Sequence, residues 1–279
     1  MEFTLSMWSV HRTTREHQWT VLDFLSYCHD QGIKQVELLD VFWKDVDEEL
    51  PYVKSYLDQH DMKAISYAVS NDFVNQDPAL RQAALDKITC ALPIAIALEA
   101  KVIRVFSGNL NGDIAYEEAQ QWIVEGLSGA ANEAEKLGLT LCLENHGLLA
   151  GTGAQIQSII DQVASPALRS TFDTGNFLLV DENPLDALHK LLPYIHHVHL
   201  KDFAATEGGR YRSLSGLAYE GRVLGEGIAQ IEPILRALHD YGYSNGIVLE
   251  YEGLEDERTG IQQCLAAFSN MMQRMEVKQ

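Results

Sequence analysis

Four apolar segments in the second half of the chain each end in residues that bind metals or transfer protons. They read LCLENHG (141–147), TFDTGN (171–176), HHVHLKD (196–202) and IVLEYEG (247–253). A carboxylate at the end of a buried segment needs a partner, because an unpaired charge is costly in a dry environment. If the segments converge, three carboxylates meet and repel one another unless a cation lies between them. The residues concerned are Glu144, Asp173, His199 and Glu250.

Three carboxylates and one imidazole form a hard, mixed set of oxygen and nitrogen ligands. We therefore expect one divalent cation, with Mn²⁺ as the first choice and Mg²⁺, Co²⁺ and Zn²⁺ as alternatives. The competing interpretation is a buried network of hydrogen bonds and ordinary ion pairs. Any one of the four residues alone would favour that network, but four of them at matched segment ends favour the metal.

Side-chain alternation along a strand selects the ligands among their neighbours. His197 and His199 share one strand face, and His199 is nearer the end, so His199 is the predicted ligand. His197 is then expected one layer deeper, either as a structural histidine or as a contact behind the ligands. Glu250 ends its apolar run directly, whereas Glu252 precedes Gly253, at the start of the expected loop. Glu250 is therefore the predicted ligand.

Eight β-rich runs alternate with eight helical patterns, which is typical of parallel α/β folds. The expected strands are 3–10, 35–39, 63–69, 102–107, 140–144, 168–173, 196–200 and 246–250. The expected helices are 20–31, 45–60, 78–98, 114–137, 154–163, 184–192, 228–241 and 257–275. The alternative, a doubly wound open sheet, lacks support because neither G-x-G-x-x-G nor a P-loop occurs. We predict a single (β/α)8 TIM barrel, in which all strand ends meet at one mouth.

We expect residues 1–279 to form one domain, since barrels of this type run to about 250 residues. The connection 202–227 is long and contains six glycines. Loops of this length in a compact domain are usually functional, so we expect either a lid over the mouth or a contact with another subunit.

The formal net charge of −19 argues against nucleic-acid binding, which usually needs a basic surface. No apolar run reaches the 18 residues that a membrane span requires. The four cysteines form no C-x-x-C pair, and the N-terminal segment lacks the pattern of a signal peptide. These features predict reduced thiols and a cytoplasmic location.

The motifs LENHG, FDTGN, HVHLKD, LGEG (224–227) and GIVLEYEG together resemble those of the xylose isomerase-like barrel superfamily. More narrowly, they look like its sugar phosphate isomerase/epimerase group. The resemblance covers the whole chain, and its specific motifs lie between Leu141 and Gly253. It implies that the metal ligands are the same four residues, and that the catalytic acid/base pair is Glu144 and Glu250.

The resemblance implies a metal-dependent isomerase or epimerase of a ketose or related keto-polyol. In that chemistry one glutamate removes a proton beside the carbonyl and the other returns it to the resulting enediolate. The alternative is a dehydratase of an inosose-like or dehydroshikimate-like substrate. An endonuclease IV-like activity would need several metals and a DNA-binding surface, and a non-catalytic sugar-binding module would not need both glutamates. The expected partner is a small sugar-like molecule, and a homo-oligomer is an expectation by analogy alone.

Six further residues are expected to contact the substrate. Asn176 stands where ketose epimerases of the superfamily often have a histidine, which weakens the 3-epimerase interpretation. Glu37 and Arg104 are expected to form a structural ion pair inside the barrel. The six substrate candidates are His146, Lys201, Asn176, Glu226, Trp8 and His11.

Overall fold

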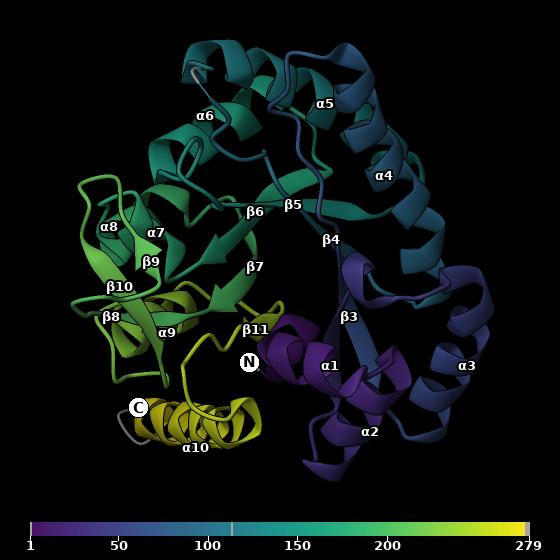
Figure 1. Ribbon diagram of the computed structural model, residues 1–279, viewed down its shortest axis with the longest axis vertical. Helices are drawn as coiled ribbons and strands as arrows, with labels where there is room; N and C mark the ends of the chain where they lie inside the picture. Colours follow the sequence, from purple (N-terminus) through teal and green to yellow (C-terminus); the bar gives the residue numbers. More distant parts are fainter. Residues whose placement is uncertain (1, 113, 277–279) are drawn as a thin grey trace.

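Eight parallel strands close into a barrel in the computed structural model, which describes residues 2–112 and 114–276. Helices surround the strands as an outer ring (Figure 1). Around the barrel the strands follow the order β1-β11-β7-β6-β5-β4-β3-β2, so the predicted TIM barrel is confirmed. The barrel strands are β1 (Phe3–Ser6), β2 (Gln35–Leu39), β3 (Lys63–Ala68), β4 (Val102–Val105), β5 (Thr140–Glu144), β6 (Leu168–Asp173), β7 (Ile195–Leu200) and β11 (Ile247–Leu249).

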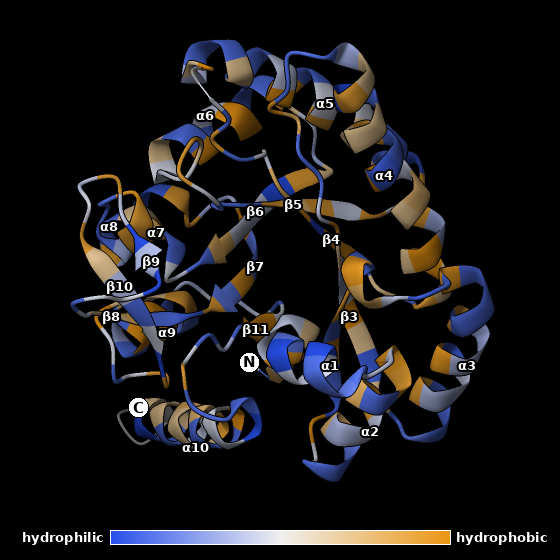
Figure 2. Ribbon diagram, viewed as in Figure 1, coloured by the Kyte–Doolittle hydropathy of each residue, from blue (hydrophilic) through white to orange (hydrophobic). Residues whose placement is uncertain are grey.

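The outer helices bury one face against the strands and expose the other, so apolar and polar residues alternate along them (Figure 2). Their starts follow ordinary capping rules: Thr20 and Asp23 form a capping box, and Asp77 caps the helix that begins with Pro78. These helices are α2 (Val21–Asp30), α3 (Val46–Gln59), α4 (Pro78–Ala97), α5 (Tyr116–Lys136), α6 (Gly153–Val163), α8 (Pro184–Leu191), α9 (Ile231–Asp240) and α10 (Glu257–Glu276).

The first strand is shorter than predicted, because the chain turns at Ser6. The Ser6 hydroxyl accepts a hydrogen bond from the backbone N–H of Trp8 (3.3 Å) and caps a 3-10 helix, η1 (Met7–Val10). Helix α1 (His11–His17) follows without a break. The expected strand over 3–10 was therefore wrong in its second half, and Trp8 and His11 lie in helices at the mouth.

The long connection after β7 contains a three-stranded antiparallel sheet, which the sequence analysis treated as loop. Its strands are β8 (Asp202–Ala205), β9 (Tyr211–Arg212) and β10 (Ala218–Arg222), in the order β8-β10-β9. The sheet packs against the mouth at Gly221, which bridges to Gly253. A Cβ atom on Gly221 would lie 2.1 Å from the carbonyl oxygen of Glu252, so only glycine permits this approach.

Short helices complete the described chain, namely η2 (Asp40–Phe42) and α7 (Asn176–Leu179). Within residues 2–112 and 114–276, no helix combines the length and the hydropathy needed to cross a membrane.

Candidate metal centre

The barrel brings all four predicted ligands together at the carboxyl ends of adjacent strands. Glu144 ends β5, Asp173 ends β6, His199 lies in β7, and Glu250 directly follows β11. Each side chain offers one ligand atom, and these atoms all lie within 4.8 Å of one another. All four residues are at least 95% buried, so water alone cannot screen their charges.

The unsatisfied atoms of this cluster suit a cation. Among the described residues, Glu144 Oε2, Asp173 Oδ2 and His199 Nδ1 are buried without a hydrogen-bond partner. Each has only ion-pair contacts, the shortest at 3.1 Å to Arg104, 3.3 Å to Lys201 and 3.3 Å to Glu250, respectively. The second oxygens of the acids are occupied: Asp173 Oδ1 accepts the N–H groups of Gly175 and Asn176, and Glu144 Oε1 accepts the Asn176 amide at 3.0 Å. Each acid is therefore held by one oxygen and presents the other to the shared space, as ligands of a hard divalent cation do.

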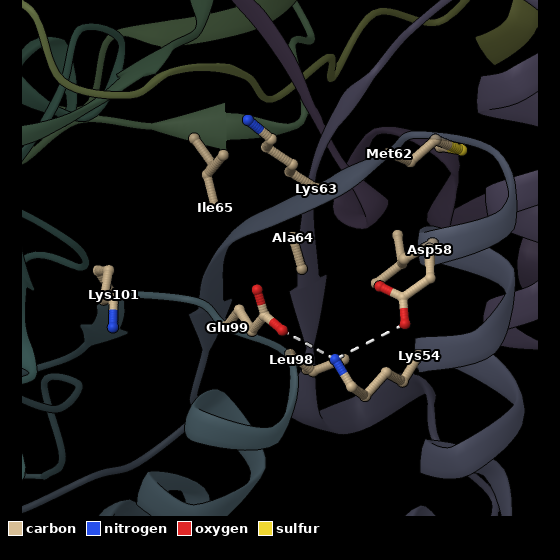
Figure 3. Close-up of a pocket in the computed structure, with 10 residues that line it drawn as sticks. Lys54, Asp58, Met62, Lys63, Ala64, Ile65, Leu98, Glu99 and Lys101 are labelled. Carbon is tan, nitrogen blue, oxygen red and sulfur yellow. Dashed lines mark hydrogen bonds and ion pairs between the residues drawn. The ribbon is translucent and has the colours of Figure 1, made fainter.

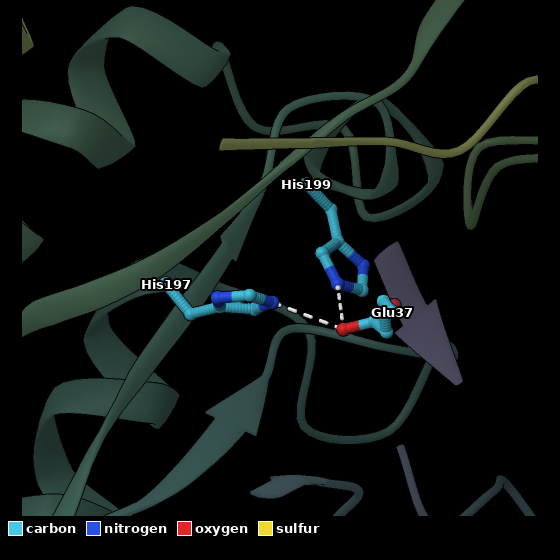
Figure 4. Close-up of side chains that lie close together, drawn as sticks. All are labelled: Glu37, His197 and His199. Atoms are coloured by element: carbon cyan, nitrogen blue, oxygen red, sulfur yellow. Dashed lines mark hydrogen bonds and ion pairs between the residues drawn. The ribbon is translucent and has the colours of Figure 1, made fainter. Parts of the chain in front are cut away.

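Glu37 on β2 holds the predicted histidine ligand from the opposite side of the barrel. Its Oε2 lies 3.2 Å from His199 Nε2 and 3.0 Å from His197 Nε2, as Figure 4 shows. Ser66 donates a further hydrogen bond to the same oxygen (2.8 Å). The Nδ1 atom of His199 consequently faces the cluster, 3.3 Å from Glu250 Oε1. The second shell of many metal sites has this carboxylate–histidine arrangement.

The expected ion pair between Glu37 and Arg104 was wrong. Both side chains point into the barrel, but Arg104 pairs with Glu144, with 3.1 Å between Nε and Oε2. Strands β4 and β5 are neighbours, and Arg104 aligns with Cys142, two residues before Glu144. Arg104 therefore reaches Glu144 diagonally along the same face, while Glu37 is taken by the two histidines.

Burial and mutual repulsion disfavour the charged forms of two of the acids. Burial raises the pKa of Asp173 to about 7, even though Lys201 opposes the shift. Burial likewise raises the pKa of Glu144 against the opposing effect of Arg104. A divalent cation would replace the protons that these carboxylates otherwise retain.

For His199 and Glu250, the neighbouring charges outweigh burial and favour the charged form of each group. Burial lowers the pKa of His199, but the nearby carboxylates, led by Glu37, outweigh burial and raise the pKa well above its usual value. Burial also raises the pKa of Glu250, yet Lys201 and His199 outweigh burial and hold that pKa low. A proton on His199 Nδ1 thus occupies the position that a cation would take.

A cavity of about 280 Å³ opens directly above the cluster. Its lining combines three of the predicted substrate contacts with residues that the sequence analysis missed. Glu252 shares its strand face with Glu250 by alternation, so it was detectable, whereas Tyr211 arrives from the inserted sheet and gave no signal. The lining residues are Trp8, Leu39, Ser70, Arg104, Phe106, Glu144, His146, Lys201, Tyr211, Glu250 and Glu252.

The other candidates lie outside the cavity lining. Asn176 is buried behind Glu144, His11 stacks on Trp8 at 4.6 Å between ring centroids, and Glu226 is exposed in the turn before α9.

His146 lines the cavity and stacks on Phe106. Burial, with Lys201 and Arg104 nearby, lowers the pKa of His146 to about 3, so this ring is neutral at pH 7.

A second cavity of about 310 Å³ lies at the other end of the barrel, beside the first residues of β3 (Figure 3). Among its charged groups, Lys54 lies 2.9 Å from Glu99 and 3.8 Å from Asp58. Active sites of β/α barrels lie at the carboxyl ends of the strands, so we assign this cavity no catalytic role.

Residues 25–271 match the family described as the xylose isomerase-like TIM barrel. This chain belongs to that family. Among solved structures, a D-tagatose 3-epimerase-like protein superposes on this xylose isomerase-like barrel with a TM-score of 0.79 and 19% identity, over 100% of this chain and 99% of the other. The IOLI protein with a binding zinc atom superposes with a TM-score of 0.78 and 17% identity, over 99% of each chain. These likenesses show the fold.

Curated relatives of the xylose isomerase-like chain carry the name inosose dehydratase. The protein from Clostridium beijerinckii is 34% identical over 146 residues, which cover 49% of this chain and 48% of the relative. The protein from Serratia proteamaculans is 27% identical over 197 residues, covering 62% and 65%. The chain thus spans about half the length of the first of these relatives.

Proposed function

We propose that this xylose isomerase-like barrel is a divalent-metal-dependent isomerase or epimerase of a ketose or related keto-polyol. One observation carries the proposal: two glutamates, Glu144 and Glu250, face the same space below a sugar-sized cavity. Their oxygens lie 3.5 Å and 3.3 Å from His199 Nδ1, on different strands. Two carboxylates placed around one reacting centre are what a proton transfer between two positions requires.

A divalent cation held by Glu144, Asp173, His199 and Glu250, with Mn²⁺ as our first choice, would polarise the substrate carbonyl and acidify the neighbouring C–H bond. Glu250 is held by Lys201 at 2.9 Å, and Glu144 is held by the Asn176 amide. One glutamate removes the proton, and the electrons of the broken C–H bond enter the new C=C bond of an enediolate. The other glutamate delivers a proton to the opposite face, giving an epimer, or to the adjacent carbon, giving an isomer.

The aromatic lining of the cavity supports this chemistry by excluding water. Trp8, Phe106 and Tyr211 line its walls. Trp8 and Tyr211 also donate hydrogen bonds to Glu252, which fixes the orientation of both rings. A reactive enediolate is protected where such walls keep bulk water away.

A second candidate is a dehydratase, favoured by the name that the curated relatives carry. The first step is the same proton removal. The enolate then expels a β-hydroxyl group as water, and an unsaturated ketone or diketone remains. The same two glutamates serve here, one as the base and one as the acid that protonates the leaving oxygen.

The test is exchange at the carbon beside the carbonyl. Protein loaded in turn with Mn²⁺, Co²⁺, Mg²⁺ and Zn²⁺ is incubated in D₂O with ketoses and inososes, followed by NMR and ultraviolet absorbance. Deuterium in a recovered isomer supports the first candidate, and a new enone absorbance supports the second. Glu144→Gln and Glu250→Gln should abolish exchange, while the exposed Glu207→Gln should not. Absence of exchange with every substrate and metal contradicts both candidates.

A further inference from the structure

The backbone amides of the turn after the inserted sheet bind the carboxylate of Asp202. β/α barrels commonly bind phosphate with the loops that follow the seventh and eighth strands. Here Asp202 Oδ2 accepts the backbone N–H groups of Gly225 (2.8 Å) and Gly227 (3.0 Å), and Oδ1 accepts that of Ala229 (3.0 Å). Asp202 is buried, and a Cβ atom on Gly227 would lie 2.1 Å from its Oδ1. The amides that would surround a phosphate are therefore occupied.

The cations of the cavity wall are also occupied. Among the described residues that line the cavity, the cations are Arg104 and Lys201. Arg104 pairs with Glu144, and its Nη1 donates to the carbonyl of Val69 (3.1 Å). Lys201 Nζ lies 2.9 Å from Glu250 Oε2, and Asp173 and Glu252 lie within 3.4 Å. Each of these two cations is therefore already paired with at least one carboxylate.

Two further cations, Arg210 and Arg15, lie near the rim but outside the cavity lining. Arg210 pairs with Glu220 at 2.6 Å and donates to the backbone carbonyl of Glu252. Arg15 stacks on Trp8, 5.8 Å from the ring centroid, and does not line the cavity.

The charges of the mouth therefore sum to zero once a divalent cation binds. Arg104, Lys201 and the divalent metal contribute four positive charges. The four negative charges come from the carboxylates of Glu144, Asp173, Glu250 and Glu252. A phosphate ester would bring a dianion into a dry site without net positive charge, where its desolvation and its repulsion by these carboxylates oppose binding. An uncharged ligand incurs no such cost.

The part of the cavity wall beside Glu250 can accept hydroxyl groups. Glu252 is buried and lines the cavity, with Oε1 accepting the Trp8 indole N–H at 3.0 Å and Oε2 accepting the Tyr211 hydroxyl. Its carboxylate has further lone pairs for the hydroxyl donors of a polyol. The rings of Trp8, Phe106 and Tyr211 offer apolar faces to the C–H groups between those hydroxyls.

We infer that this mouth accepts an uncharged keto-polyol and excludes its phosphate ester, with Glu252 as the residue that determines this specificity. The inference rests on the proposed function, because it names the substrate class of the same site.

The test compares a neutral compound with its own phosphate ester on metal-loaded protein. The pairs are D-fructose with D-fructose 6-phosphate and D-ribulose with D-ribulose 5-phosphate, together with an inosose, and Kd is measured by calorimetry. The ester should bind on the order of a hundredfold more weakly than its parent. Glu252→Gln should reduce this preference about tenfold by removing one repelling charge. Glu207→Gln removes a charge from an exposed turn of the same insert and should leave the preference unchanged.

The binding preference and the exchange reaction separate the two claims. Esters that bind as tightly as their parents, or neutral compounds that do not bind at all, overturn the inference. An unchanged preference in Glu252→Gln overturns the role of that residue. Neutral compounds that bind selectively but never take up deuterium leave the inference standing and count against the proposed function. Deuterium exchange into phosphate esters would support the proposed function and overturn the inference that the mouth excludes them.

Discussion

Glu37 Oε2 lies 3.2 Å from His199 Nε2, although β2 and β7 are not neighbours in the barrel. The contact crosses the barrel interior and leaves the other ring nitrogen, Nδ1, facing the carboxylates of Glu144 and Glu250. Glu37, which is not one of the four predicted ligands, therefore fixes which nitrogen of the histidine faces the other three.

Glu37→Gln should weaken metal binding by about 10- to 100-fold, because the neutral amide no longer holds His199 or increases its basicity. Metal affinity measured by calorimetry or by competition with a chelating dye checks this. Melting of the chelated variant shows whether the barrel remains folded.

Ser66→Ala is the matched control for that change. It removes one hydrogen bond to Glu37 but keeps the carboxylate and both histidine contacts. Its metal affinity should change less than about fivefold, because the carboxylate and both histidine contacts remain and the lost hydrogen bond acts on the metal only through Glu37. Equal losses in the two variants would mean that Glu37 acts only through packing.

Asn176→Ala should slow proton exchange about tenfold while metal affinity stays within a few-fold, because Asn176 orients Glu144 through the oxygen that faces away from the cluster. Exchange rate and metal Kd are measured on the same preparation. Asn183→Ala removes a helix-capping amide on the same connection and should not slow exchange in the folded protein. A large loss of metal binding in Asn176→Ala would show that the residue supports the ligands rather than the reacting glutamate.

Metal removal should destabilise the fold. The three buried carboxylates of the cluster then have Arg104, Lys201 and His199 as their ion-pair partners. Metal at 100 times Kd adds about 2.7 kcal/mol to the free energy of unfolding by mass action. Thermal melts with and without chelator measure this difference, which should nearly vanish in Asp173→Ala. If neither chelator nor added metal changes the melting temperature of the wild type, the proposed metal centre is contradicted.

Metal uptake should release protons, and the number should fall with rising pH. The pKa of Asp173 is raised to about 7, so below that pH the cation must displace its proton, while above it the carboxylate is already ionised. The pKa of His199 is also raised well above its usual value, so its proton too must leave when a cation binds at low pH. We expect more protons released per cation at pH 6 than at pH 8, with affinity falling as pH falls. Calorimetry in buffers of different ionisation enthalpy counts them, and a pH-independent count would contradict this assignment.

The sequence located Glu144, Asp173, His199 and Glu250 because parallel strands in a barrel direct their carboxyl ends to one mouth. Alternation also placed His197 one layer deeper than His199, and in the structure His197 is buried and contacts Glu37, a partner that the sequence did not predict. These inferences depend only on the strand period and the direction of the chain.

What the sequence could not supply were partners across the barrel and contacts from irregular segments. Alternation shows that Glu37 and Arg104 both point inward, but not which residue each one meets. The sequence predicted that β1 continues to Val10, because a pattern of apolar residues carries no signal of the hydroxyl cap at Ser6. Tyr211 reaches the cavity from a two-residue strand in a glycine-rich connection, which carries no periodic signal.

The most direct test of the metal centre is the metal content of protein purified without chelator, measured by mass spectrometry for wild type, Glu144→Gln and His199→Ala. We predict about one divalent ion per wild-type chain, in line with the four-ligand cluster at the mouth, and its loss in both variants. A wild type that carries no metal and takes up none of Mn²⁺, Co²⁺, Mg²⁺ or Zn²⁺ would contradict the metal centre and the chemistry proposed for it.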